Sequence, residues 1–269
     1  MVSEIKFLSG RDVRRSFLIV EGSDDSKFWR LRVNEHCVIV IASCKSVGVR
    51  AVRKLNGRGH IGHVGVFDRD YDDATTPSTY RQNIIFWDGH SLEAILYFSD
   101  AAQRVIAEKI DPADLATCER ALGKSLHVHI AEVCVKVGEM RYLHATSGVQ
   151  VDASALAPHR FIQRNTNLTF DTAALYAKAV DLGIVPSVAQ IQAHVATIPR
   201  TLLNRFLTRG HDLSALLGSV FGDYGGTGKV KDVEAALRLA FHRSELEVTS
   251  VYHELRAWEK EREPFRVLA

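Results

Sequence analysis

Four aspartates lie close together directly after a short apolar stretch of the chain. Residues 62–67 are mostly apolar with β-branched and aromatic side chains, which predicts a buried parallel strand, and Asp68, Asp70, Asp72 and Asp73 follow it. Open α/β sheets bind ligands just beyond the carboxyl ends of their strands. Carboxylates this close together repel one another, and a cation removes that penalty. Oxygen ligands at this density favour Mg²⁺ or Mn²⁺ over zinc, whereas an isolated acidic turn would simply be solvated.

Another carboxylate lies at the end of a short apolar strand earlier in the sequence. Residues 17–21 read as another buried strand, which ends in Glu21 and leads into a helix. If the two strands are parallel neighbours, Glu21 meets Asp68 and Asp70 at one edge of the sheet. Asp25, in the first turn of the following helix, is a further candidate ligand, as is Asp72.

This ordered pair of strand ends, Val-Glu-Gly and then Asp-x-Asp, resembles the TOPRIM domain that topoisomerases, bacterial primases and OLD-type nucleases share. The resemblance covers about the first hundred residues. It implies that Glu21, Asp68 and Asp70 are catalytic and hold Mg²⁺ or Mn²⁺. It further implies a divalent-metal-dependent endonuclease, in which the metal activates water and stabilises the charge that develops on the scissile phosphate.

A further acidic residue follows the strand expected over residues 83–87. Ser91 is placed to cap a helix, and Glu93 then falls in the first turn, where an early glutamate commonly interacts with the helix dipole. A Ser-Leu-Glu helix at this point also resembles a subgroup of small TOPRIM proteins linked to phage defence. That resemblance implies Glu93 as a metal ligand, and both interpretations stay open.

The same subgroup includes the TOPRIM effectors of the PARIS antiphage systems, which act on tRNA and which this chain resembles. The resemblance implies a toxic effector that cleaves tRNA, other RNA or DNA. It also implies a partner, since such effectors are often encoded beside an ABC-type ATPase that holds or triggers them.

The apolar pattern predicts an α/β fold with a mostly parallel sheet flanked by helices. Strands and helices alternate as far as about residue 100, with strands expected at 17–21, 37–42, 62–67 and 83–87 and helices at 24–33 and 46–55. Beyond residue 110 the spacing of apolar residues is helical. We therefore expect a TOPRIM-like α/β catalytic core over residues 1–110 and an α-helical region over residues 111–269. The helical region would serve dimerisation, giving a homodimer, or contact with a partner.

Two groups of basic residues are candidates for binding a nucleic-acid backbone. The first contains no acidic residue between positions 45 and 60, and Arg50 is expected to share a helix face with Arg53 or Lys54. Such runs are commonly solvated helix faces, but the missing acidic partners favour phosphate contact. The predicted nucleic-acid-binding residues are Lys45, Arg50, Arg53, Lys54 and Arg58 in this group, and Arg205, Arg209 and His211 in the second.

The second group ends in a Gly-His-Asp segment with two interpretations. Gly210 reads as the residue that ends one helix, and Asp212 as the cap of the next. The segment also resembles one in the defence-linked subgroup, which implies that His211 contacts the substrate or assists proton transfer.

Composition limits the classes of protein that need to be considered. The chain has 269 residues, 46% of them hydrophobic, and a net charge of only +2, so a nucleic-acid surface must be a local patch. Its four cysteines lack the C-x-x-C spacing of a zinc site, and neither a signal peptide nor a membrane-spanning apolar run is visible. These features predict a cytoplasmic protein without membrane contact.

Two other functions remain open at this stage. A TOPRIM scaffold could bind nucleic acid or a partner without cutting. A haloacid-dehalogenase-like phosphatase would use Asp68 as nucleophile and Asp70 as acid/base, but its motif has Thr or Val where Asp72 stands, and Glu21 would have no role. Topoisomerases and primases need additional domains for which the chain has no room.

Overall fold

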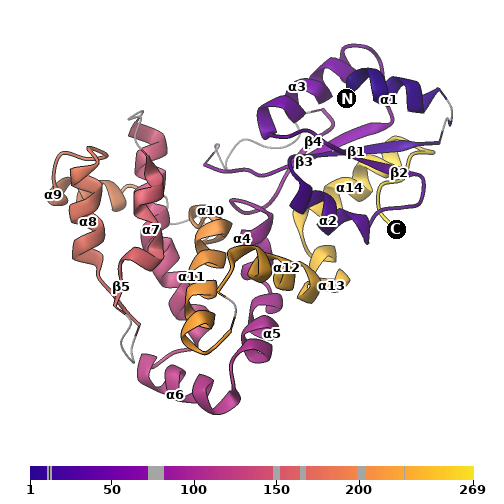
Figure 1. The fold of residues 1–269 in the computed structure, drawn as a ribbon. Helices are drawn as coiled ribbons and strands as arrows, with labels where there is room; N and C mark the ends of the chain where they lie inside the picture. The colour runs from indigo at the N-terminus through magenta and orange to yellow at the C-terminus, as the bar shows by residue number, and fades with distance from the viewer. Residues whose placement is uncertain are drawn as a thin grey trace. The chain divides into compact units, whose positions relative to one another are not determined.

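The chain folds into two compact units (Figure 1). The structure, a computed structural model, describes residues 1–10, 12, 14–71, 82–147, 152–163, 168–198, 204–226 and 228–269. The first unit comprises residues Met1–Asp88 and His242–Ala269, and the second comprises Gly89–Phe241. The boundary expected at residue 110 thus falls inside the second unit, because the helices just before it pack on helices further along that unit.

A four-stranded parallel sheet forms the centre of the first unit. Its strands are β1 (Ser16–Val20), β2 (Cys37–Ile41), β3 (His63–Phe67) and β4 (Ile84–Phe86). β1 and β3 are buried along their whole length, as expected for parallel strands covered on both faces. The predicted α/β fold, with a parallel sheet flanked by helices, is therefore confirmed.

The strand order is β2-β1-β3-β4, so the direction of winding reverses between β1 and β3. The chain passes from β1 to β2 on one side and returns to β3 on the other side of β1. Residues Phe17 and His63 are paired, as are Ile19 and Gly65, so the two strands run in register. The residues that follow β1 and β3 therefore leave the sheet side by side, at the place where open α/β sheets form ligand sites.

Helices cover both faces of this sheet. α1 (Val2–Ser9) and α3 (Lys45–Asn56) lie over one face, and α2 (Ser23–Arg30) and α14 (Ser250–Glu261) over the other (Figure 1). The short helix α13 (Arg243–Glu247) precedes α14. A Cβ atom added at Gly48 would lie 2.3 Å from the Phe67 ring, so glycine is needed where α3 meets β3. This close packing fixes the start of α3 relative to the sheet edge.

The second unit is almost entirely helical. Its helices are α4 (Leu92–Tyr97), α5 (Asp100–Lys109), α6 (Pro112–Leu122), α7 (Leu126–Ser147), α8 (Thr172–Asp181), α9 (Val188–Val195), α10 (Asn204–Leu207), α11 (Gly210–Asp223) and α12 (Val230–Ala240). A two-stranded antiparallel ribbon joins β5 (Ile162–Gln163) to β6 (Thr169–Phe170). No helix in the described part of the chain is long and apolar enough to cross a membrane.

A helix break is present but lies slightly earlier than expected, because α10 ends at Leu207 and α11 begins at Gly210, so the roles expected for Gly210 and Asp212 are wrong. Both residues belong to the first turn of α11, and Gly210 begins that helix. A Cβ atom at Gly210 would lie 2.5 Å from the Cβ of Glu93, so glycine lets α11 approach α4 closely. Asp212 is buried and accepts two hydrogen bonds from the Arg141 guanidinium, at 2.6 and 2.9 Å, instead of capping a helix.

His63 at the start of β3 makes the stability of the first unit sensitive to acid. It is fully buried, and this burial, with a contribution from the neighbouring His60, lowers the pKa of His63 to about 4. Between pH 6.5 and pH 4 only the unfolded chain gains a proton at this position, so the free energy of unfolding falls as the pH falls. The loss amounts to at most about 2 kcal/mol at pH 5.

We predict that His63→Gln reduces this acid sensitivity. Urea unfolding at pH 7 and pH 5 should show a smaller loss of unfolding free energy in the variant than in the wild type. An equal loss in both proteins would contradict the assignment of a neutral, buried His63.

Candidate functional site

The carboxyl ends of β1 and β3 bring two acidic residues together. Glu21 directly follows β1, and Asp68 directly follows β3. The backbone N–H of Asp68 donates a hydrogen bond to Oε1 of Glu21 at 2.9 Å. The contact lies at the reversal of strand order, where a ligand site is expected in this class of fold.

Asp70 adds a third carboxylate on the same loop, and it forms an ion pair. Its backbone is in the left-handed region, with φ of +54°. Its Oδ2 lies 2.5 Å from Nζ of Lys45, which also donates to the Arg69 carbonyl oxygen at 3.1 Å. Lys45 is the first residue of α3, so the helix that follows β2 delivers a positive charge to the acidic loop.

The electrostatic environment of Glu21 disfavours its charged form. Burial is the largest cause that raises the pKa of Glu21, and the negative charge of Asp70 raises it further. The Asp68 N–H and the Lys45 side chain and backbone N–H act in the opposite direction without cancelling the increase. Additional positive charge at this edge would therefore stabilise the Glu21 carboxylate.

Asp25 and Asp72 are the two other residues of the first unit that were predicted to bind the metal ion. Oδ2 of Asp25 accepts a hydrogen bond from the Gly22 N–H at 3.0 Å, which caps the start of α2. One oxygen of Asp25 is thus used for helix capping. Asp72 lies outside the described residues.

Glu93 belongs to the second unit, where other charged residues surround it. Burial raises the pKa of Glu93, and the negative charge of Glu234 adds to the effect, while Ser91 and Arg238 oppose it. Ser91 caps α4 through its hydroxyl, as predicted, by accepting the Ala94 N–H at 3.4 Å. Within its own unit, Glu93 is therefore a partly buried acid in the first turn of α4.

The donor chemistry of the sheet edge suits a hard divalent cation. Among the residues that the structure describes, no group of three His, Cys, Asp or Glu side chains is arranged to hold a metal ion. Glu21, Asp68 and Asp70 nevertheless follow the ends of β1 and β3 and carry carboxylates, which are the donor type that Mg²⁺ and Mn²⁺ prefer. The raised pKa of Glu21 also indicates a site short of positive charge.

The basic residues of α3 separate into two environments. Arg50, Arg53 and Lys54 are exposed, while the apolar residues of the helix pack on the sheet, and Arg58 is exposed just beyond the end of α3. Lys45 is different, because its ammonium group contacts the acidic loop. Sequence reasoning placed Lys45 with the phosphate-binding residues and missed this contact. The same strand-end argument that found Glu21 points to it, since Lys45 lies just beyond the end of β2.

The second group of predicted nucleic-acid-binding residues lies in the second unit. Arg209 is exposed at the start of α11, and Arg205 lies over the ring of Phe206. Nδ1 of His211 lies 3.3 Å from Oε1 of Glu234, and this contact raises the pKa of His211. These three residues therefore form a set distinct from the exposed face of α3.

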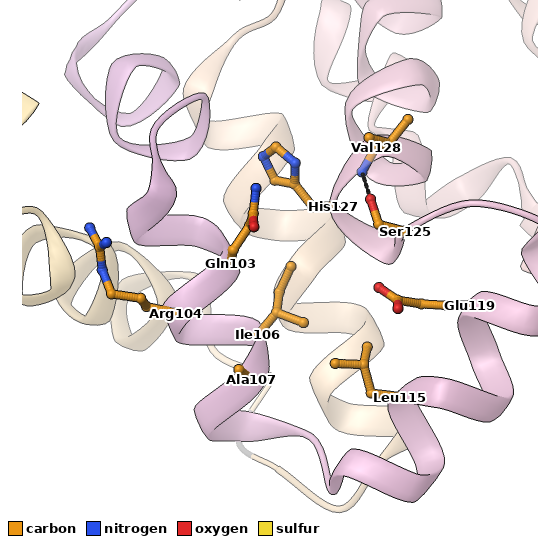
Figure 2. Close-up of a pocket in the computed structure, with 9 residues that line it drawn as sticks. All are labelled: Gln103, Arg104, Ile106, Ala107, Leu115, Glu119, Ser125, His127 and Val128. Atoms are coloured by element: carbon orange, nitrogen blue, oxygen red, sulfur yellow. Dashed lines mark hydrogen bonds between the residues drawn. The ribbon is translucent and has the colours of Figure 1, made fainter.

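A pocket of about 460 Å³ lies among α5, α6 and the start of α7 (Figure 2). Ser125, His127 and Glu119 line it, which are the residue types of a hydrolytic triad. Each instead contacts the backbone: Ser125 Oγ accepts the Val128 N–H, Glu119 accepts the Leu126 N–H, and His127 Nε2 faces the Tyr97 carbonyl oxygen. These side chains therefore link neighbouring segments of the helices. They do not form the hydrogen-bonded relay of nucleophile, base and acid that nucleophilic catalysis requires.

The fold and the sheet edge together define an α/β protein with an acidic site at the reversal of a parallel sheet. No family model matches the chain, and no curated protein matches it in sequence.

We predict that Glu21→Gln does not destabilise the metal-free protein at neutral pH. Between the ordinary Glu pKa of 4.5 and the raised pKa in the folded protein, the folded state binds more protons, so stability falls as the pH rises. Glutamine removes this penalty and keeps an oxygen for the Asp68 N–H. In EDTA at pH 7.5 the variant should melt at or above the wild-type temperature, and this advantage should disappear near pH 4. A clearly lower melting temperature at pH 7.5 would contradict the account.

Proposed function

We propose that this chain is a divalent-metal-dependent endonuclease of the TOPRIM type that hydrolyses phosphodiester bonds of nucleic acids. The observation that carries the proposal is the contact between Glu21 and the Asp68 backbone at the reversal of strand order. It unites the two strand ends, Val-Glu-Gly and Asp-x-Asp, in which the sequence resembles TOPRIM nucleases. Asp70, on the same loop, supplies the third carboxylate.

Glu21, Asp68 and Asp70 would hold Mg²⁺ or Mn²⁺ at this edge. When bound, the cation supplies an activated water and stabilises the charge that develops on the scissile phosphate. The protein fixes these carboxylates on the ends of two buried strands, which is a rigid support. The hydrogen bond from the Asp68 N–H holds one Glu21 oxygen in place, so the acid does not depend on a mobile loop for its orientation.

The exposed basic residues of α3 would bind the nucleic-acid backbone. Arg50, Arg53 and Lys54 present positive charge on a helix that begins at the acidic edge, and Arg58 adds to it in the turn after that helix. Phosphate contacts of this kind position a nucleic acid without reading its sequence. The first unit would thus supply both parts that the reaction needs, a metal site formed by the acidic residues and a basic surface.

The phosphatase alternative accounts for fewer of the contacts. It uses Asp68 as nucleophile and Asp70 as acid/base, and it leaves Glu21, which accepts the Asp68 N–H, without a function. Trapping of an aspartyl-phosphate would support the phosphatase, and absence of divalent-metal binding would support the non-cleaving scaffold.

The cellular role and the partner that we propose follow from the resemblance to defence-linked TOPRIM proteins. The chain would act in the cytoplasm as a toxic effector, controlled by an ABC-type ATPase, on tRNA, other RNA or DNA. Its helical second unit would provide homodimer or ATPase contacts. Sequencing of RNA and DNA termini after induced expression distinguishes the substrates.

We predict that cleavage requires Mg²⁺ or Mn²⁺ and the charge of Glu21. EDTA should abolish cleavage, and Glu21→Gln should reduce it at least about 100-fold, the scale of losing a group that stabilises the transition state. Asp24→Asn is the matched control, because Asp24 is a nearby carboxylate paired with Lys27 at 3.0 Å. Cleavage at the wild-type rate by folded Glu21→Gln protein would refute the proposal.

We predict that the exposed face of α3 contributes to the salt dependence of binding. Replacing Arg50, Arg53 and Lys54 with alanine should weaken binding and reduce the slope of log K against log salt by about 0.7–0.9 for each lost phosphate contact. A triple alanine variant at Lys109, Lys229 and Lys231, which are exposed in the second unit, removes the same charge. Equal slopes for the two triple variants would contradict a specific role for α3.

A further inference from the structure

We propose that Lys45 is a displaceable counter-charge, which holds Asp70 while the acidic edge is metal-free and turns to the substrate phosphate when a divalent cation takes that carboxylate. The inference rests on the proposed function and adds a role in positioning the substrate. It departs from the simpler view that Lys45 belongs to the exposed phosphate-binding face of α3.

The contacts of Lys45 are those of a counter-charge. Its Nζ lies 2.5 Å from Asp70 Oδ2 and 3.1 Å from the carbonyl oxygen of Arg69. Its side chain is only 21% exposed, so much of it is enclosed by the edge of the sheet. The ammonium group thus contacts the acidic loop itself rather than facing outward with Arg53 and Lys54.

The acidic edge needs a positive charge in the absence of metal. Glu21 follows β1 and accepts a hydrogen bond from the Asp68 N–H, and Asp70 lies two residues further along the same loop. Gathering these carboxylates on two neighbouring strand ends is costly unless a cation offsets their repulsion. Lys45 provides that cation from within the chain.

The ion pair is also built to open. The Asp70 side chain is 50% exposed, and ion pairs with this much water access contribute little to stability. Lysine carries its charge on a flexible stem of four carbons, so the ammonium can move several ångströms while the backbone stays fixed. The start of α3 does stay fixed, because Gly48 packs directly on Phe67.

A divalent cation at Glu21 and Asp68 would compete with Lys45 for the Asp70 carboxylate. Two positive charges at this distance repel each other, so binding of the cation favours release of the lysine. The released ammonium remains at the edge, where a phosphate that approaches the cation would meet it. Lysine is a common point-charge ligand of phosphate.

The first test compares metal affinity in variants. Mn²⁺ is titrated by electron paramagnetic resonance into the wild type, Lys45→Met and the control Lys54→Met, which removes an exposed charge from the same helix. We expect Lys45→Met to bind Mn²⁺ roughly two- to tenfold more tightly than the wild type, because a competitor and a repelling charge are gone. Lys54→Met should differ less. Equal or weaker binding by Lys45→Met would overturn the inference.

The second test uses the wild-type protein and does not depend on a variant that folds. Acetylation of lysine amines is followed by mass spectrometry with and without Mn²⁺. Acetylation of Lys45 should become faster when Mn²⁺ is added, relative to Lys54, and an unchanged or slower rate would overturn the inference. If the wild type binds no Mn²⁺, the proposed function fails; if it binds Mn²⁺ and Lys45 does not respond, only this inference fails.

Discussion

Partial burial of a carboxylate, that of Glu21, where two parallel strands end side by side is the constraint on which the rest of this site depends. Glu21 and Asp68 are adjacent because β1 and β3 are paired in register, and neither can move away without disturbing a buried strand. Burial is the largest cause that raises the pKa of Glu21, and the charge of Asp70 raises it further, while the Asp68 N–H and Lys45 lower it. The same constraint makes the edge receptive to a cation.

Helix α3 connects the acidic edge to the basic surface. Its first residue, Lys45, contacts Asp70, and its exposed residues Arg50, Arg53 and Lys54 follow along the same helix. Close packing at Gly48 fixes this helix on β3, so the distance between the acidic edge and the basic face is set by the fold. Helix α3 therefore places the positively charged face close to the negatively charged edge of the sheet.

Local sequence patterns predicted most of the first unit and the central pair of acids. The four strands were predicted to within about one residue, because each is a short apolar run bounded by polar residues. The proximity of Glu21 to Asp68 followed from the rule that parallel strand ends share one edge. The pairing of Lys45 with Asp70 was missed because a run of basic residues was treated as one helix face.

Long-range contacts explain what sequence patterns could not predict. The local pattern predicts a helix end at Gly210 and a cap at Asp212, yet the preceding helix already ends at Leu207. Contacts with α4 and Arg141 place Gly210 and Asp212 in the first turn of α11. Local sequence patterns also do not predict that residues His242–Ala269 return to the first unit. This return depends on packing of α14 beside β4, including a hydrogen bond from the Trp258 indole to Asn83 at 2.9 Å.

The central claim is that Glu21 and Asp68 share one divalent cation at the reversal of the sheet. The most direct measurement is an anomalous difference map from crystals of the wild-type protein grown with Mn²⁺. The account predicts a peak about 2.0–2.2 Å from carboxylate oxygens of both residues, the distance expected for a small hard cation. A well-ordered edge with no peak between Glu21 and Asp68, in crystals that hold Mn²⁺ elsewhere, would contradict it.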